Sequence, residues 1–151
     1  MGLLPAAAGS VKTTVRHVAA DLAAFERIAA RFAATLRAGD VVALEGELGA
    51  GKTTFVAAVA RALGAADEVA SPTFIFRHRY AGSPPIEHLD LYRIDDPAEA
   101  VELGLDEALG GDAIAFVEWP ERIPGFVPAD ALRVRIAGSG SSARTVDISG
   151  H

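Results

Sequence analysis

The chain of 151 residues contains no cysteine, no asparagine and no glutamine, and its only lysines are Lys12 and Lys52. The absence of cysteine excludes disulfides, thiol catalysis, and zinc or iron–sulfur sites with cysteine ligands. The absence of amide side chains excludes the glutamine that orients water in Ras-type GTPases. It equally excludes the Asn-Lys-x-Asp type of guanine recognition, so small-GTPase chemistry is ruled out.

The sequence also lacks a long hydrophobic run and an excess of basic residues. No apolar run reaches the roughly 18 residues of a transmembrane helix, and the N-terminus lacks the basic start of a signal peptide. We therefore expect a cytoplasmic protein without membrane contact. The net charge of −6 and the pI near 5.1 disfavour a protein that binds nucleic acid by itself. The length favours one domain over residues 1–151, with residues 1–12 outside its ordered part.

Hydrophobic periodicity predicts a fold of the α/β class. It indicates helices over residues 21–40, 52–65 and 96–109. Apolar or alternating runs indicate strands over residues 11–18, 40–46, 71–80, 86–94, 112–120, 131–138 and 144–150. Asp21 is the expected N-cap of the first helix and Gly39 its expected end, while Gly104 should break the third helix. We predict a single P-loop NTPase-like domain, in which helices flank a mixed β-sheet with two hairpins.

The segment GELGAGKT, residues 46–53, fits the pattern G-x-x-x-x-G-K-[ST] between a predicted strand and a predicted helix. In such a loop the backbone N–H groups and the positive end of the helix dipole surround phosphates. Lys52 would reach the β- and γ-phosphates, Thr53 would ligate Mg²⁺, and Thr54 could contact the α-phosphate. Because the Asn-Lys-x-Asp type of guanine recognition is excluded, we expect ATP or ADP as the ligand. The predicted nucleotide-binding residues are Gly46, Glu47, Leu48, Gly49, Ala50, Gly51, Lys52, Thr53 and Thr54.

Two acidic residues follow apolar strands and are candidates for the same site. Glu118 ends the run AIAFVE, where nucleotide-binding proteins of this type carry a carboxylate for the metal. Mg²⁺ needs few protein ligands, so Thr53 and Glu118 would suffice. Asp90, in HLDLYR, could orient the attacking water or support the metal, but its spacing equally fits an ordinary half-buried residue. Trp119 could shield the site or only pack at its rim.

A further stretch, SPTF at residues 71–74, precedes a predicted strand. Thr73 could sense the γ-phosphate as a switch residue does. A plain turn at Ser71-Pro72 explains the same residues at least as well.

Taken together, GELGAGKTTF, SPTF, HLDLYR and VEWPER, in this order and spacing, resemble the TsaE family, formerly YjeE. The resemblance spans roughly residues 13–137. It implies a small ATPase that binds ATP or ADP with Mg²⁺, hydrolyses ATP slowly alone and acts with the TsaB and TsaD proteins. That machinery attaches the threonylcarbamoyl group to adenosine 37 of tRNA, which would be met only indirectly through the complex.

The same resemblance implies roles for individual residues. Lys52 and Thr53 become the phosphate and magnesium residues, and Glu118 completes the magnesium shell. Asp90 becomes the favoured catalytic carboxylate, Lys52 also takes part in catalysis, and Thr73 becomes a switch-like threonine. ATP hydrolysis would reset the complex or permit its turnover.

Three other functions are compatible with parts of the sequence. A small-molecule kinase shares the P-loop, but it usually needs an arginine-bearing lid, and Arg77, Arg79 and Arg93 fall in a predicted hairpin. A nucleotide-sensing module would bind ADP without useful turnover. A protein that binds nucleic acid by itself would shift the electrophoretic mobility of tRNA without partners. The acidic net charge of the chain disfavours this function.

Overall fold

The computed structural model describes residues 13–65 and 76–150, in which seven strands form one sheet. The strands are β1 (Thr14–Ala19), β2 (Val41–Glu45), β3 (Arg77–Tyr80), β4 (Ile86–Asp90), β5 (Ile114–Glu118), β6 (Leu132–Ala137) and β7 (Arg144–Ser149). Three α-helices accompany them: α2 (Leu22–Ala33), α3 (Lys52–Ala62) and α4 (Pro97–Glu102). Two short 3-10 helices complete the described part, η1 (Leu105–Ala108) and η2 (Pro120–Arg122).

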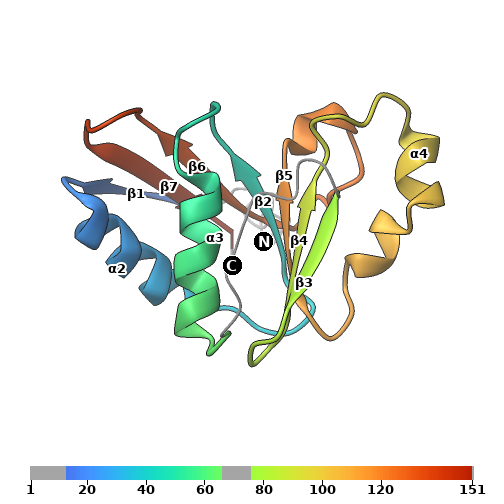
Figure 1. The fold of residues 1–151 in the computed structure, drawn as a ribbon, viewed down its shortest axis with the longest axis horizontal. Coiled ribbons are helices and arrows are strands. Elements are labelled where there is room, and N and C mark those ends of the chain that lie inside the picture. Colours follow the sequence, from blue (N-terminus) through green and yellow to red (C-terminus); the bar gives the residue numbers. More distant parts are fainter. Residues whose placement is uncertain (1–12, 66–75, 151) are drawn as a thin grey trace, which may run out of the picture.

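The sheet has the order β1-β7-β6-β2-β5-β4-β3 and is mixed, as predicted (Figure 1). The four central strands β6, β2, β5 and β4 run parallel. Both outer hairpins are antiparallel: β3 pairs with β4, and β7 pairs with β6 and β1. Since parallel strands end at the same edge of a sheet, the carboxyl ends of β2, β4 and β5 lie side by side. This edge is where ligands bind in open α/β sheets.

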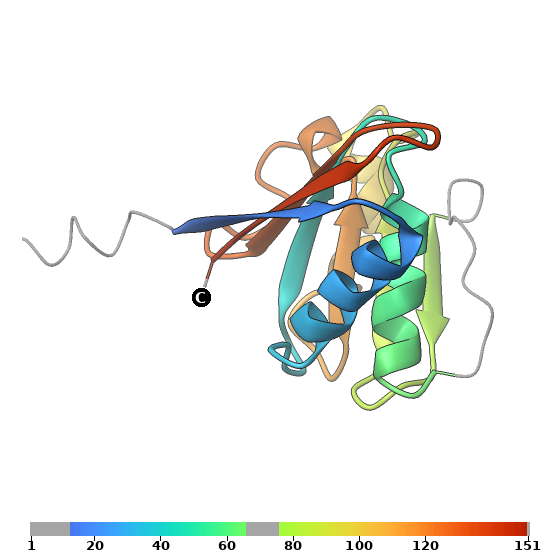
Figure 2. The same cartoon turned by 90° about the vertical axis from the view of Figure 1, so that its left-hand side faces the viewer.

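Helices cover both faces of the sheet. On one face α2 and α3 pack against each other (Figures 1 and 2), and the Phe55 ring centroid of α3 lies 5.8 Å from that of Phe25 and 5.9 Å from that of Phe32 in α2. On the other face α4 and η1 enclose a second core with residues such as Leu89 and Val117. Within the described ranges, no helix combines the length and apolar character required to cross a membrane.

Most of the predicted elements are confirmed, but the strand predicted over residues 86–94 ends at Asp90, and α2 also ends earlier than predicted. Asp21 caps this helix as predicted, accepting the Ala24 N–H at 2.8 Å. The helix ends at Ala33, however, well before Gly39. The Thr35 hydroxyl donates to the Phe32 carbonyl at 2.7 Å, and such local bonds compete with helix propagation. Gly39 instead forms part of the turn into β2, where its N–H donates to Ala113 O at 2.9 Å.

The third predicted helix is divided as expected. Asp96 caps α4 by accepting the Ala98 N–H at 3.0 Å, and Pro97 occupies the first turn. Gly104, with a φ of 72°, separates α4 from η1. These two short helices close the sheet face opposite α2 and α3.

Candidate functional site

The glycine-rich loop lies between β2 and α3, as the motif predicts. Gly46 follows β2, and a Cβ on this residue would lie only 2.7 Å from the Ile136 carbonyl oxygen of β6. Since that oxygen belongs to the backbone of a central strand, only glycine fits here. The loop then turns through Gly51, which caps α3 and leaves the N-terminus of the helix open. The loop therefore has the shape that a phosphate cradle requires.

Lys52 lies inside the loop rather than in solvent, with a side chain that is 6% exposed. Its Nζ donates to the Gly46 carbonyl and lies 4.1 Å from the centroid of the Trp119 ring. Burial lowers the pKa of Lys52, and the carboxylates of Glu118 and Asp90 act in the opposite direction. The ammonium group thus stands partly desolvated between the loop and two acids, where a polyphosphate would give it a stronger counter-charge.

Asp90 and Glu118 come together at the carboxyl ends of neighbouring parallel strands. The register of β4 and β5 pairs the two residues directly, and they are 2% and 3% exposed. Asp90 Oδ1 accepts the Tyr92 N–H at 2.8 Å, which fixes the carboxylate against the turn that follows β4. Both residues are therefore buried beside the glycine-rich loop rather than half-buried, and their roles in metal binding and catalysis stay predictions.

Glu118 has a partner that the sequence did not reveal. His88 Nε2 lies 2.6 Å from Glu118 Oε2, and the histidine is completely buried. Because an ionised carboxylate only accepts hydrogen bonds, Nε2 then carries the proton. His88 Nδ1 has no hydrogen-bond partner among the residues that the structure describes. The completely buried ring of His88 therefore holds one oxygen of Glu118 in place.

Trp119 does more than pack at the rim. This residue has a φ of 57°, which is uncommon for a bulky side chain and typical of functional sites. Its ring lies between Lys52 and Tyr92, with 4.9 Å between the Trp119 and Tyr92 ring centroids. Arg122 supports the group from outside, donating to Tyr92 O at 2.8 Å. Trp119 therefore covers Lys52, in agreement with the shielding role.

A cavity of 390 Å³ brings most of the predicted residues together. The loop and α3 contribute Leu48, Gly49, Gly51, Lys52, Thr53 and Thr54, and the facing side contributes Asp90, Tyr92, Glu118 and Trp119. Gly46, Glu47 and Ala50 line a neighbouring cavity of 450 Å³ beside β6. Thr73 lies outside the described residues, so its switch role stays a prediction. In residues 13–65 and 76–150, no group of three or more His, Asp or Glu residues could hold a metal by itself.

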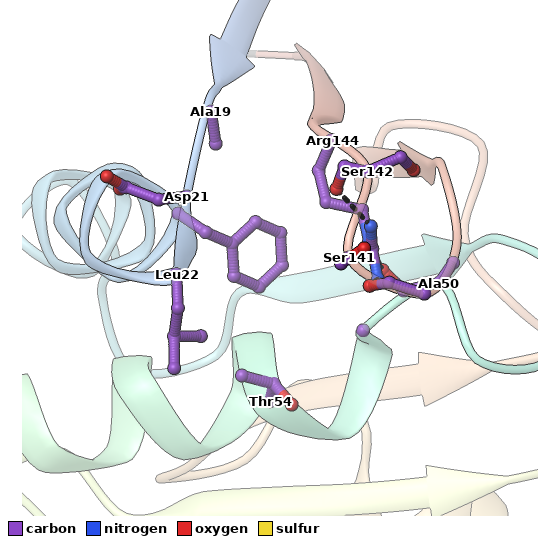
Figure 3. Close-up of a pocket in the computed structure, with 11 residues that line it drawn as sticks. Ala19, Asp21, Leu22, Ala50, Thr54, Ser141, Ser142 and Arg144 are labelled. Carbon is purple, nitrogen blue, oxygen red and sulfur yellow. Dashed lines mark hydrogen bonds between the residues drawn. The ribbon is translucent and has the colours of Figure 1, made fainter.

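The start of α3 also borders a cavity of 310 Å³, called the second cavity below, which Figure 3 shows. The second cavity shares Gly51 and Thr54 with the cavity of 390 Å³. One wall of the second cavity comes from the start of α2, with Asp21 and Leu22, and the facing wall comes from the loop between β6 and β7, with Ser141 and Ser142. Both cavities therefore border the glycine-rich loop at the start of α3.

Arg77 and Arg79 of the β3–β4 hairpin line neither of these two cavities. Arg77 and Arg79 both bind Glu87, at 3.0 Å, and Arg79 also binds Asp112 at 2.7 Å. Side chains alternate along a strand, so Glu87 lies on the face of β4 opposite His88 and Asp90. Two of the three candidate arginines of a kinase lid, Arg77 and Arg79, therefore do not reach the site.

Fold and site define an α/β protein with a glycine-rich strand–loop–helix element of the P-loop type. The family model "Threonylcarbamoyl adenosine biosynthesis protein TsaE" matches residues 19–146. The chain therefore belongs to the TsaE family, as the motifs predicted.

Individual relatives agree with this assignment. The tRNA threonylcarbamoyladenosine biosynthesis protein TsaE of Bacillus subtilis is 42% identical over 120 residues, which cover 79% of this chain and 75% of that protein. The protein of the same name from Streptomyces coelicolor is 44% identical over 110 residues, covering 70% of this chain and 74% of that protein. The crystal structure of Bacillus subtilis YdiB superposes with a TM-score of 0.79 at 32% identity, covering 93% of this chain and 87% of that chain.

Proposed function

We propose that this protein is a magnesium-dependent ATPase that acts with TsaB and TsaD in the threonylcarbamoylation of adenosine 37 of tRNA. One observation carries the proposal: Lys52, Thr53, Asp90 and Glu118 line a single cavity at the carboxyl edge of the sheet. The names of the relatives, all tRNA threonylcarbamoyladenosine biosynthesis proteins, support the pathway. The tRNA would be met through the complex, which agrees with the net charge of −6.

The residues of the site fit a nucleotide with Mg²⁺. Thr53 offers a hydroxyl and Glu118 a carboxylate, which are the hard oxygen ligands that Mg²⁺ prefers, and the ion usually keeps several waters. Bound there, Mg²⁺ would neutralise charge on the phosphates. Lys52 would leave the Gly46 carbonyl for the phosphates. We assign the base to the second cavity, because Thr54 connects it to the phosphate loop.

We assign the activation of the attacking water to Asp90. A carboxylate that is almost fully buried at the rim of the phosphate loop can hold the attacking water and accept its proton. The bond from the Tyr92 N–H keeps this carboxylate in one orientation. Trp119 covers Lys52 and excludes water from that side, which strengthens electrostatic contacts within the site.

The test separates binding from hydrolysis. Trp119 is the only tryptophan of the chain, and its ring lies 4.1 Å from Lys52 Nζ, so its fluorescence should change when ATP or ADP binds. The Asp90→Ala variant should bind ATP and lose hydrolysis in the presence of TsaB and TsaD. Asp112→Ala, which removes an exposed carboxylate bound to Arg79, is the matched control. Hydrolysis by Asp90→Ala at the parent rate would refute the role of Asp90. Binding without hydrolysis in the parent, even with both partners, would indicate a nucleotide sensor.

A further inference from the structure

Arg144 lies at the start of β7, outside every motif, yet its guanidinium group joins two loops. Its Nε donates to the Ala50 carbonyl of the glycine-rich loop at 2.8 Å. Its Nη1 donates to the Ser142 carbonyl at 2.6 Å, and its Nη2 donates to the Gly140 carbonyl at 2.9 Å. Ser142 and Gly140 belong to the loop of residues 138–143 between β6 and β7. One side chain thus connects the phosphate loop to a segment that is far away in the sequence.

The loop of residues 138–143 has its own internal bonds, which shape it without attaching it to the phosphate loop. The Ser139 N–H donates to Ser142 Oγ at 3.2 Å, and the Ser142 N–H donates to Ser139 O at 3.1 Å. The loop begins at Gly138, with a φ of 121°. A Cβ at this position would lie 2.5 Å from Ala143 O and 2.9 Å from Arg144 Cδ. The chain therefore passes closely beside the stem of Arg144, and Gly138 makes that approach possible.

The chemistry of these contacts indicates a positioning role. Three N–H donors of the guanidinium are directed at backbone carbonyls, and bonds from a charged donor are stronger than neutral ones. The planar, rigid group fixes the relative positions of the three carbonyls. Because these donors are already bonded to backbone carbonyls, the role of Arg144 is to hold the two loops together and not to bind a phosphate.

The location of the two loops gives this connection a consequence for binding. Gly140, Ser141, Ser142 and Ala50 all line the 310 Å³ cavity, and Figure 3 shows Ala50 on the same side of it as Ser141 and Ser142. We infer that Arg144 positions the β6–β7 loop as the wall of the nucleobase pocket, and so sets the part of nucleotide affinity that depends on the base. The inference rests on the nucleotide site proposed above.

The test compares a ligand with a base and a ligand without one. The affinities of ADP and of inorganic tripolyphosphate, each with Mg²⁺, are measured by calorimetry for the parent, Arg144→Met and Arg144→Lys. For Arg144→Met we expect the affinity for ADP to fall about tenfold or more, and the affinity for tripolyphosphate by less than about threefold; tenfold is ~1.4 kcal/mol. Arg144→Lys should lie between the parent and Arg144→Met, because its ammonium can still donate to one or two of the carbonyls.

Two further variants keep the test decisive. Gly138→Ala should reproduce the loss of Arg144→Met, because its Cβ would lie 2.5 Å from Ala143 O and 2.9 Å from Arg144 Cδ and so displaces the loop together with the arginine side chain. Arg16→Met, which removes an exposed arginine that binds Asp147 of the same strand β7 at 2.7 Å, should change neither affinity. An equal loss for ADP and tripolyphosphate, or no loss for either, would overturn the inference. A parent protein that binds neither ligand would instead overturn the proposed nucleotide site.

Discussion

The contact between His88 and Glu118 leads to a prediction about magnesium. Replacing His88 by leucine removes the donor 2.6 Å from Glu118 Oε2 and leaves this carboxylate almost fully buried. A hydrogen bond to a charged group contributes about 1.5–3 kcal/mol, so the free energy of unfolding should fall by about that amount. Residues that orient a metal ligand typically affect metal affinity by about 10- to 100-fold. We therefore expect the Mg²⁺ concentration at half-maximal ATPase rate to rise by that factor.

A conservative variant separates orientation from stability. The amide nitrogen of Gln in His88→Gln can donate from nearly the position of Nε2, so this variant should restore most of the magnesium affinity. His78→Leu is the matched control, because His78 pairs with His88 across the β3–β4 register and is exposed. The assay is the ATPase rate as a function of Mg²⁺ with TsaB and TsaD present, next to urea unfolding. A His88→Leu protein that is destabilised but keeps the parent magnesium requirement would refute the reasoning.

Three more predictions concern the phosphate loop and the acids. Lys52→Met should weaken ATP binding about 10- to 100-fold, the equivalent of a charged hydrogen bond of about 1.5–3 kcal/mol; unchanged Trp119 fluorescence titrations would contradict this. Asp90→Ala should lower the ATPase rate by about 10²–10⁴-fold with ATP affinity largely kept, as stopped assays and titrations would reveal. Burial lowers the pKa of Lys52 in the free protein, and bound polyphosphate should raise it. ATP binding should then take up protons at alkaline pH: the affinity is fully present below the pKa of the free state and is lost as the pH rises through the pKa of the bound state. Calorimetry in buffers of different ionisation enthalpy measures this uptake, and its persistence in Lys52→Met would assign it to another group.

Local signals in the sequence predicted the parts of the site that neighbouring residues determine. The spacing of Gly46, Gly51, Lys52 and Thr53 predicted a strand, a loop and a helix, because each of these residue types suits the backbone at its own position in the motif. The apolar run before Glu118 likewise predicted a buried strand with an acid at its end, and β5 (Ile114–Glu118) lies within the predicted residues 112–120 and ends at that acid. The cap at Asp21 was equally local.

The contacts that the sequence did not predict join residues distant along the chain. His88 meets Glu118 only through the register of β4 and β5, and Arg144 meets Ala50 only because β7 returns beside the phosphate loop. Hydrophobic periodicity indicates which face of a strand is buried, but it does not indicate which strand lies beside it. Neither contact could therefore be predicted from the sequence pattern. The error at Gly39 has a different cause, since the hydroxyl of Thr35 ends α2 by a side-chain bond that a hydrophobic pattern does not record.

The central claim is that the cavity of Lys52, Asp90 and Glu118 hydrolyses ATP as part of a larger complex. The most direct test measures magnesium-dependent ATP hydrolysis by the purified protein, first alone and then with TsaB and TsaD. We predict a low rate alone and a clear rise with both partners, abolished in Asp90→Ala. A protein that binds ATP but shows no rise with its partners would contradict the claim.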